Sequence, residues 1–138
     1  MTDDRELQET DQGWTIRLDG RDVSQILIDY RYSLRFGGGA EVVIEAPFTL
    51  RSPNGERVID PVEISQLAPA LTVLHQIVRS ATATRDGRLV LVFVDGQEIE
   101  VGPIDSGENW QVLFPNGRML VGLPGGDIAA FPAREGGK

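Results

Sequence analysis

Few residues in this sequence could carry catalytic chemistry. Cysteine is absent and His75 is the only histidine, so thiolate nucleophiles, disulfides, zinc–thiolate sites and iron–sulfur ligation are excluded. His75 is expected on the polar face of a helix, where a catalytic triad would need a serine and an aspartate brought from elsewhere. We interpret it as a solvent-facing side chain, and we predict no catalytic residue, no metal site and no cofactor.

Carboxylates offer the remaining reactive chemistry. Asp105, Glu108 and Asp127 lie in or beside predicted loops, and Trp110 lies close to two of them in the sequence. Two such carboxylates could act as an acid/base pair or supply oxygen ligands to a cation. We define these four residues as the candidate ligand loop. The alternative interpretation is a solvated acidic surface, because nothing in the sequence shows that the carboxylates converge.

A mixed apolar and acidic face is the second candidate site. Val90 and Val92 alternate with apolar residues in one predicted strand, and Glu98 and Glu100 do so in the next. We expect the four side chains to share one face of a sheet, where they would suit contact with a protein partner. The alternative is that a terminal segment of the chain covers part of this face.

The charge of the chain narrows the class of partner. Acidic residues number 21 and basic residues 13, for a formal net charge of −8 at pH 7. This balance argues against non-specific binding to nucleic acid and favours attraction of a basic protein partner. We therefore expect an uncharacterised, non-catalytic, acidic protein-binding module.

Three alternative functions stay open at this point. One is a small-ligand-binding domain with a pocket between sheet and helix, lined by Tyr30, Tyr32 or Trp110. Another is a toxin-neutralising protein similar to an immunity protein. The least favoured is a carboxylate-based enzyme. A homodimer formed through an edge strand is a further prediction.

Alternation of apolar and polar residues predicts antiparallel strands. Residues 26–36 carry apolar side chains at even numbers, which is the period of one half-buried strand, and residues 42–50 do the same. Both segments turn even numbers inward, and three glycines separate them. This parity predicts that Arg35 lies opposite Glu41 on the outer face. The same argument opposes Leu91 to Ile99 in a later hairpin.

The two halves of the sequence repeat one another. A phenylalanine precedes a turn glycine by three residues in both halves, at Phe36 and at Phe93. An aromatic residue precedes a Pro-Asn-Gly turn by five residues in both halves, at Phe48 and at Trp110. We interpret the pattern as an internal duplication. The alternative is chance similarity between hairpins built from common turn residues.

The segment between the halves, residues 61–81, is predicted as one amphipathic helix with a break near Ala68, after which the main helix begins at Pro69. Apolar residues at helical spacing, Leu74 among them, share one face, and His75 lies on the opposite face. The predicted fold class is therefore α+β: mainly antiparallel β, with two pseudo-repeated β-meanders at about 14–59 and 88–131. The central amphipathic helix is expected to pack on the sheet.

One domain is expected over residues 1–138, with flexible tails at 1–12 and 132–138. The N-terminal residues lack the cationic start and apolar core of a signal peptide. Apolar runs fall well short of the ~20 residues of a membrane span. We therefore predict a cytoplasmic protein that makes no contact with a membrane.

Several short motifs are spread over about residues 20–131. They are Asp29-Tyr30, Ile44-Glu45-Ala46-Pro47-Phe48, Asp60-Pro61, Leu67 to Leu74, Asp86-Gly87-Arg88-Leu89, Phe93-Val94-Asp95-Gly96, Glu108-Asn109-Trp110 and Pro124-Gly125-Gly126. On these motifs the sequence resembles an uncharacterised family of small actinobacterial proteins, a domain of unknown function. The resemblance implies no activity, and the sequence departs from the family at Phe131, where a tryptophan is expected.

Overall fold

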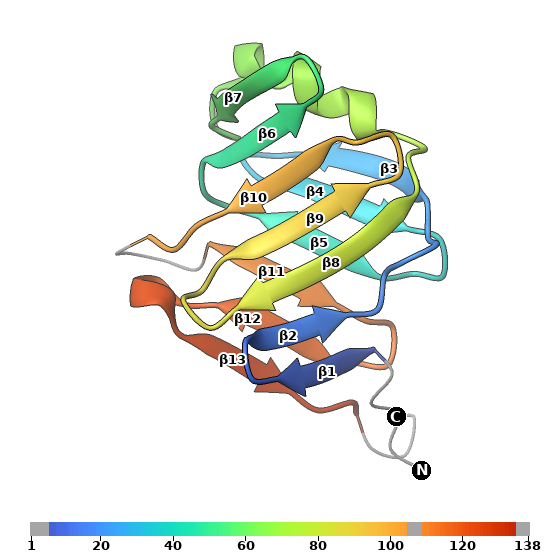
Figure 1. Ribbon diagram of the computed structural model, residues 1–138, viewed down its shortest axis with the longest axis vertical. Helices are drawn as coiled ribbons and strands as arrows, with labels where there is room; N and C mark the ends of the chain where they lie inside the picture. Colours follow the sequence, from blue (N-terminus) through green and yellow to red (C-terminus); the bar gives the residue numbers. More distant parts are fainter. Residues whose placement is uncertain (1–5, 105–108, 135–138) are drawn as a thin grey trace.

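Antiparallel β-strands make up most of the regular secondary structure of the molecule (Figure 1). The computed structural model describes residues 6–104 and 109–134, and thirteen strands and three short 3₁₀ helices form within them. The strands are β1 (Leu7–Thr10), β2 (Gly13–Ile16), β3 (Val23–Ile28), β4 (Tyr32–Phe36), β5 (Glu41–Ile44), β6 (Phe48–Ser52), β7 (Gly55–Ile59), β8 (Val78–Thr84), β9 (Leu89–Phe93), β10 (Glu98–Val101), β11 (Trp110–Leu113), β12 (Met119–Gly122) and β13 (Ile128–Phe131). The 3₁₀ helices are η1 (Ile64–Gln66), η2 (Ala68–Val73) and η3 (Pro124–Gly126).

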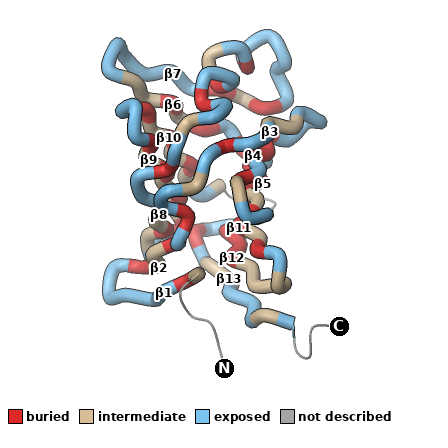
Figure 2. The backbone as a smooth tube through the Cα atoms, turned by 90° about the vertical axis from the view of Figure 1, so that its right-hand side faces the viewer, coloured by how far each residue is buried: buried red, intermediate tan, exposed pale blue. Residues whose placement is uncertain are grey.

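Two antiparallel sheets pack against each other. The seven-stranded sheet has the order β1-β2-β8-β9-β10-β6-β7, and the six-stranded sheet has the order β13-β12-β11-β5-β4-β3. Figure 2 shows the two sheets as two columns of strands. One buried apolar cluster draws side chains from both of them, including Phe93 from β9 and Leu34 from β4, which are 0% exposed. The molecule is thus a two-layer β structure with the core between the sheets.

The prediction of a helix over residues 61–81 is wrong, and the predicted α+β fold class is therefore wrong as well. Only η1 and η2 form in the first part of this segment, and β8 takes up the last part. A 3₁₀ helix has three residues per turn, so Leu67, Ala70 and Val73 lie on one buried side. Leu74, predicted to be buried, is 40% exposed. The fold is nearly all antiparallel β.

A β-bulge explains why the end of the predicted helix, residues 78–81, carries apolar side chains at helical spacing although it is part of a strand. The pairing of β8 with β9 shifts register between Val78 and Ser80, with Arg79 as the extra residue. Val78 and Ala81 therefore both face the core although they are three residues apart. That spacing is also the spacing of one helix face. The β-branched residues of this segment agree with the strand instead.

The long strand predicted over residues 26–36 is two strands, β3 and β4, joined by a tight turn. Tyr30 occupies the turn with a φ of 72°, in the left-handed region, and its side chain is 77% exposed. From Ile26 onward the even-numbered residues of β3 lie opposite the inward-facing even-numbered residues of β4, so the alternation passes through the turn without a break. The predicted register of the next hairpin is confirmed: Arg35 pairs with Glu41. The later pairing of Leu91 with Ile99 is confirmed as well.

The internal duplication is present in the fold, but its units are not single-sheet meanders. One unit runs from β3 to β7 and the other from β8 to β12. Each unit places its first three strands in one sheet and its last two in the other sheet. The units exchange strands, because β6 pairs with β10 and β5 pairs with β11. The second unit therefore begins within the predicted helix, at β8.

Reciprocal hydrogen bonds relate the starts of the two units. The Gly20 N–H donates to the Val78 carbonyl, and the His75 N–H donates to the Val23 carbonyl, both at 2.8 Å. Gly20 and His75 also share a left-handed backbone, with φ of 83° and 70°. The solvent-facing position predicted for His75 is correct, since its side chain is exposed. It lies at a junction between two units, however, and not on a helix.

Both ends of the described chain are hydrogen-bonded to the rest of the fold. Residues 7–10, assigned by sequence to a flexible tail, form β1, and Leu7 is 2% exposed. Near the other end, the Arg134 N–H donates to the Asn116 carbonyl. Within residues 6–104 and 109–134, no helix has the length and apolar character needed to cross a membrane.

Candidate functional site

The structure places Val90, Val92, Glu98 and Glu100 together on the outer face of the seven-stranded sheet. Glu98 lies opposite Val92, and Glu100 lies opposite Val90, in the β9–β10 hairpin. All four residues are half-buried. The alternation predicted from sequence therefore put these residues on the correct side of the correct strands.

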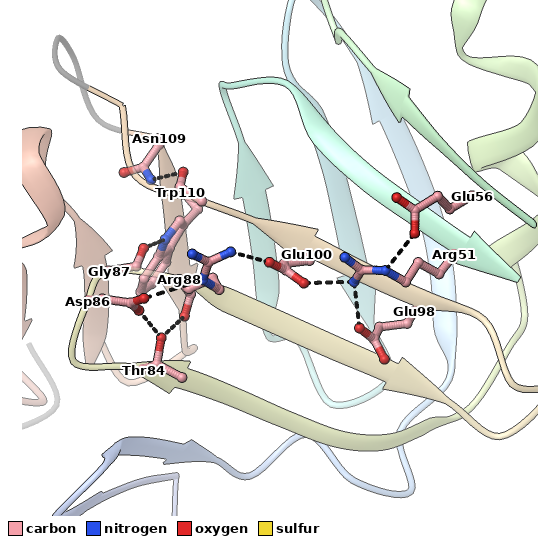
Figure 3. Close-up of polar contacts among 11 residues, drawn as sticks. Arg51, Glu56, Thr84, Asp86, Gly87, Arg88, Glu98, Glu100, Asn109 and Trp110 are labelled. Atoms are coloured by element: carbon pink, nitrogen blue, oxygen red, sulfur yellow. Dashed lines mark hydrogen bonds and ion pairs between the residues drawn. The ribbon is translucent and has the colours of Figure 1, made fainter.

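Arg51 of β6 connects the two glutamates of this face (Figure 3). β6 pairs with β10, so Arg51 stands directly beside Glu98. Its Nη1 donates to Glu98 Oε2 at 2.9 Å and to Glu100 Oε1 at 2.7 Å. Its Nε donates to Glu56 Oε1 of the edge strand β7 at 3.1 Å. One guanidinium thus holds carboxylates from two neighbouring strands.

Arg88 extends the network toward the turn between β8 and β9. Its Nη1 donates to Glu100 Oε2, so Glu100 binds one guanidinium with each carboxylate oxygen. Its Nε donates to Asp86 at 3.4 Å, and the Thr84 hydroxyl donates to the same carboxylate. We call these charged residues the charged ladder: Arg51, Glu56, Asp86, Arg88, Glu98 and Glu100.

Two carboxylates of the ladder, Glu100 and Asp86, are held in the ionised form. Hydrogen bonds from Arg51 and then from Arg88 lower the pKa of Glu100 below its ordinary value of 4.5, against a smaller opposing effect of burial. The hydrogen bond from Thr84 lowers the pKa of Asp86. The hydrogen bond to Glu100 in turn raises the pKa of Arg88. These carboxylates are therefore poor proton donors at neutral pH, and their geometry suits recognition better than acid–base catalysis.

The ladder carries more negative than positive charge. Four carboxylates share two guanidiniums, so the network itself has an acidic excess. Sequence reasoning found Glu98 and Glu100 but missed Arg51 and Arg88 as their partners. Arg51 lies 47 residues before Glu98, and three strands lie between β6 and β10 in the chain, so the local alternation of residues carries no signal for this pairing.

Only two residues of the candidate ligand loop, Trp110 and Asp127, lie in the part of the chain that the structure describes. Asp105 and Glu108 lie outside the described residues. Trp110 is 0% exposed, and its indole N–H donates to the Gly87 carbonyl at 3.0 Å. The Asp127 side chain is exposed, at the end of η3. Trp110 is therefore a core residue, and Asp127 belongs to the surface.

The aromatic pocket considered from the sequence is not formed by Tyr30, Tyr32 and Trp110. Tyr32 is 0% exposed, stacks on Phe48 at a ring-centroid distance of 4.9 Å, and donates its hydroxyl proton to the Ala70 carbonyl at 2.6 Å. Tyr30 points outward from its turn. These three aromatic residues therefore lie in two separate environments, and the helix that was to close the pocket is absent.

Comparisons with known proteins give one result. The model of a family of unknown function, DUF6188, matches residues 14–132. Comparison with curated proteins gave no match, and comparison with solved structures gave no match either. The resemblance predicted from sequence is thus confirmed as a domain of unknown function, while nothing in the match indicates an actinobacterial origin. Because the family model covers most of its length, the chain belongs to the DUF6188 family.

Proposed function

We propose that the chain is a non-catalytic protein-binding module, and that a basic protein docks on the outer face of its seven-stranded sheet. The charged ladder, with Val90 and Val92 beside it, is the observation that carries this proposal. Apolar side chains in the middle of a charged surface are typical of protein interfaces.

The ladder is preorganised for recognition. Glu100 accepts hydrogen bonds at both oxygens, and its side chain is only 17% exposed. Arg51 is held at three carboxylates from two strands. Side chains that are already ordered lose little conformational entropy when a partner binds. The face therefore offers a fixed pattern of charge rather than a set of mobile side chains.

The whole chain supports a basic partner. Its formal net charge is −8 at pH 7, and the ladder contributes an acidic excess of its own. A surface of this sign accelerates association with a positively charged protein, and salt weakens that effect. Association is therefore expected to slow as ionic strength rises.

A charge-introducing variant tests the docking face. Proteins captured from an extract of the source cells are identified, purified and titrated against the wild-type chain and against the double variant Val90→Lys and Val92→Lys. We expect the variant to weaken binding by at least about tenfold, because each lysine places a cation where a basic partner docks. The control is Ser24→Lys, which adds one lysine on the exposed edge of the other sheet. Equal affinity of the wild-type chain and the double variant would refute the docking face.

Two further proposals are toxin neutralisation, which is a finer version of this function, and self-association, which does not depend on a basic partner. Toxin neutralisation is the version in which the basic partner is a toxin, and co-expression of the chain with that toxin would then restore growth. In self-association, an edge strand pairs with a second copy. β1 and β7 are the edges of one sheet, and β13 and β3 those of the other. Sedimentation at increasing concentration tests it.

A groove beside η2 favours one second candidate, the binding of a small anion. Its volume is about 330 Å³, and Arg57, Ser52, Thr72 and Gln97 contribute to its lining. Arg57 pairs with Leu50 across the β6–β7 hairpin, so it lies on the side of the sheet that faces inward. Titration with phosphate or succinate, followed by NMR, tests this candidate. Shifts at Arg57 that are abolished by Arg57→Gln would support it.

A further inference from the structure

A notch lies where the two sheets meet near β1, β2 and β13, at the lower end of the molecule in Figure 1. Its volume is about 240 Å³, and its lining consists of Glu9, Trp14, Arg85, Asp127 and Ile128. The lining comes from both sheets and from the residue that precedes β13. We call this feature the Trp14 notch.

The walls of the notch are partly apolar. Trp14 and Ile128 pack against the core while staying half-buried, so part of each side chain borders the notch. Trp110, the other tryptophan of the chain, is 0% exposed. Glu9 lies directly opposite Trp14 in the β1–β2 pair, which puts the two side chains on the same side of the sheet.

The charges of the notch leave one carboxylate without an ion pair. The Arg85 guanidinium binds Glu9 at 3.1 Å and also donates to the carbonyls of Asp11 and Thr10, at 3.1 and 2.7 Å. Arg85 thus holds the turn between β1 and β2 and offsets the charge of Glu9. Asp127 forms no ion pair within residues 6–104 and 109–134. The notch is therefore acidic overall and has an aromatic wall.

We infer that the Trp14 notch binds an arginine side chain of the partner protein. The inference rests on the proposed function and names a second contact for the same basic partner. A guanidinium stacks on an indole face and forms paired hydrogen bonds with a carboxylate. Trp14 supplies the indole, Asp127 supplies the carboxylate, and Ile128 supplies apolar surface for the aliphatic stem.

A small probe tests the notch without the partner. N-acetyl-arginine amide is titrated into the full chain, and the two tryptophan indole N–H signals are followed by NMR. We expect a saturable shift of the Trp14 signal and no shift of the Trp110 signal, because the Trp110 indole is buried and bonded to Gly87. N-acetyl-citrulline amide, which is neutral and nearly isosteric, is expected to cause no shift.

Two charge-matched variants complete the test. Asp127→Asn is expected to weaken probe binding by about tenfold, since it removes a charge-assisted hydrogen bond. Glu63→Gln makes the same change of net charge at an exposed residue before η1 and is expected to bind the probe as the wild-type chain does. Equal binding of the citrulline probe, or unchanged binding by Asp127→Asn, would overturn the inference.

The outcomes separate the notch from the docking face. If Val90→Lys and Val92→Lys weaken partner binding while the arginine probe leaves the Trp14 signal unchanged, the notch is refuted and the proposed function stands. If the probe binds at Trp14 and the partner binds the double variant as tightly as the wild-type chain, the docking face is refuted instead.

Discussion

The hydroxyl of Tyr32 is a polar group inside an apolar core, and its hydrogen bond to the Ala70 carbonyl joins β4 to η2. Burial raises the pKa of the Tyr32 hydroxyl, so this group stays a neutral donor. Tyr32→Phe leaves the Ala70 carbonyl without that donor and is expected to lower the free energy of unfolding by about 1–3 kcal/mol. Urea denaturation measures the loss. Tyr30→Phe, at a residue that is 77% exposed, is the control, and an equal loss there would contradict the argument.

Equivalent backbone positions carry different residues at the starts of the two repeat units. Gly20 and His75 share a left-handed φ, which costs a residue with a Cβ about 1–2 kcal/mol. No atom lies within 4 Å of a Cβ built on Gly20, so Gly20→Ala is expected to cost about 1 kcal/mol through conformation alone. His75→Gly is expected to raise the free energy of unfolding by up to about 1 kcal/mol. Thermal melts of both variants measure these changes, and a larger loss for His75→Gly than for Gly20→Ala would refute the equivalence.

Among the elements, the turn between β8 and β9 packs closely on η3. A Cβ on Gly87 would lie 2.6 Å from the Gly126 Cα, and Gly87 also has a left-handed φ of 93°. Gly87→Ala is therefore expected to cost about 3 kcal/mol or more, from overlap as well as conformation. Gly125→Ala is the matched control, because its φ is 80° and nothing lies within 4 Å of its Cβ. It is expected to cost about 1 kcal/mol by calorimetry. Equal costs would show that the turn and η3 are not in contact.

The strands that carry the charged ladder should lose stability in acid. Arg51 and Arg88 lower the pKa of folded Glu100 below 4.5, so the unfolded chain binds protons first as the pH falls. This contribution to stability is present above the ordinary pKa and is lost as the pH falls through the folded pKa. Glu100→Gln should therefore flatten the dependence of unfolding free energy on pH between about 5 and 3. Glu63→Gln, which removes an exposed carboxylate outside the ladder, is the control. A Glu100→Gln curve parallel to that of the wild-type chain would contradict the role of the ladder.

Elements formed by neighbouring strands could be predicted, because side-chain parity and turn residues are local signals. The registers of Arg35 with Glu41 and of Leu91 with Ile99 follow from parity together with the length of the glycine-containing turn. The bulge at Arg79 is an exception, because it changes the spacing of inward-facing residues in β8 from two to three. The turn at Tyr30 was missed because it preserved the parity of both strands.

At the scale of the whole molecule, the candidate site was predictable only in part. Val92 and Glu98 were placed on one face because they are hairpin neighbours. Arg51 reaches the same face only because β6 leaves its own unit and pairs with β10 of the other. The notch likewise needs Trp14 and Asp127, which lie at opposite ends of the chain. Contacts of this kind follow from topology, which local residue patterns do not encode.

The exchange of strands between units predicts that neither unit folds alone. A chain break after Val62, which is 55% exposed, gives fragments 1–62 and 63–138. Each fragment lacks the strands that cover its apolar faces, because β6 must pair with β10 and β5 with β11. We expect each fragment to be unfolded by circular dichroism and NMR, and an equimolar mixture to regain the spectrum of the intact chain. A cooperative melt from either fragment alone would show that one unit has its own core, and the two units would then be independent domains joined by η1 and η2.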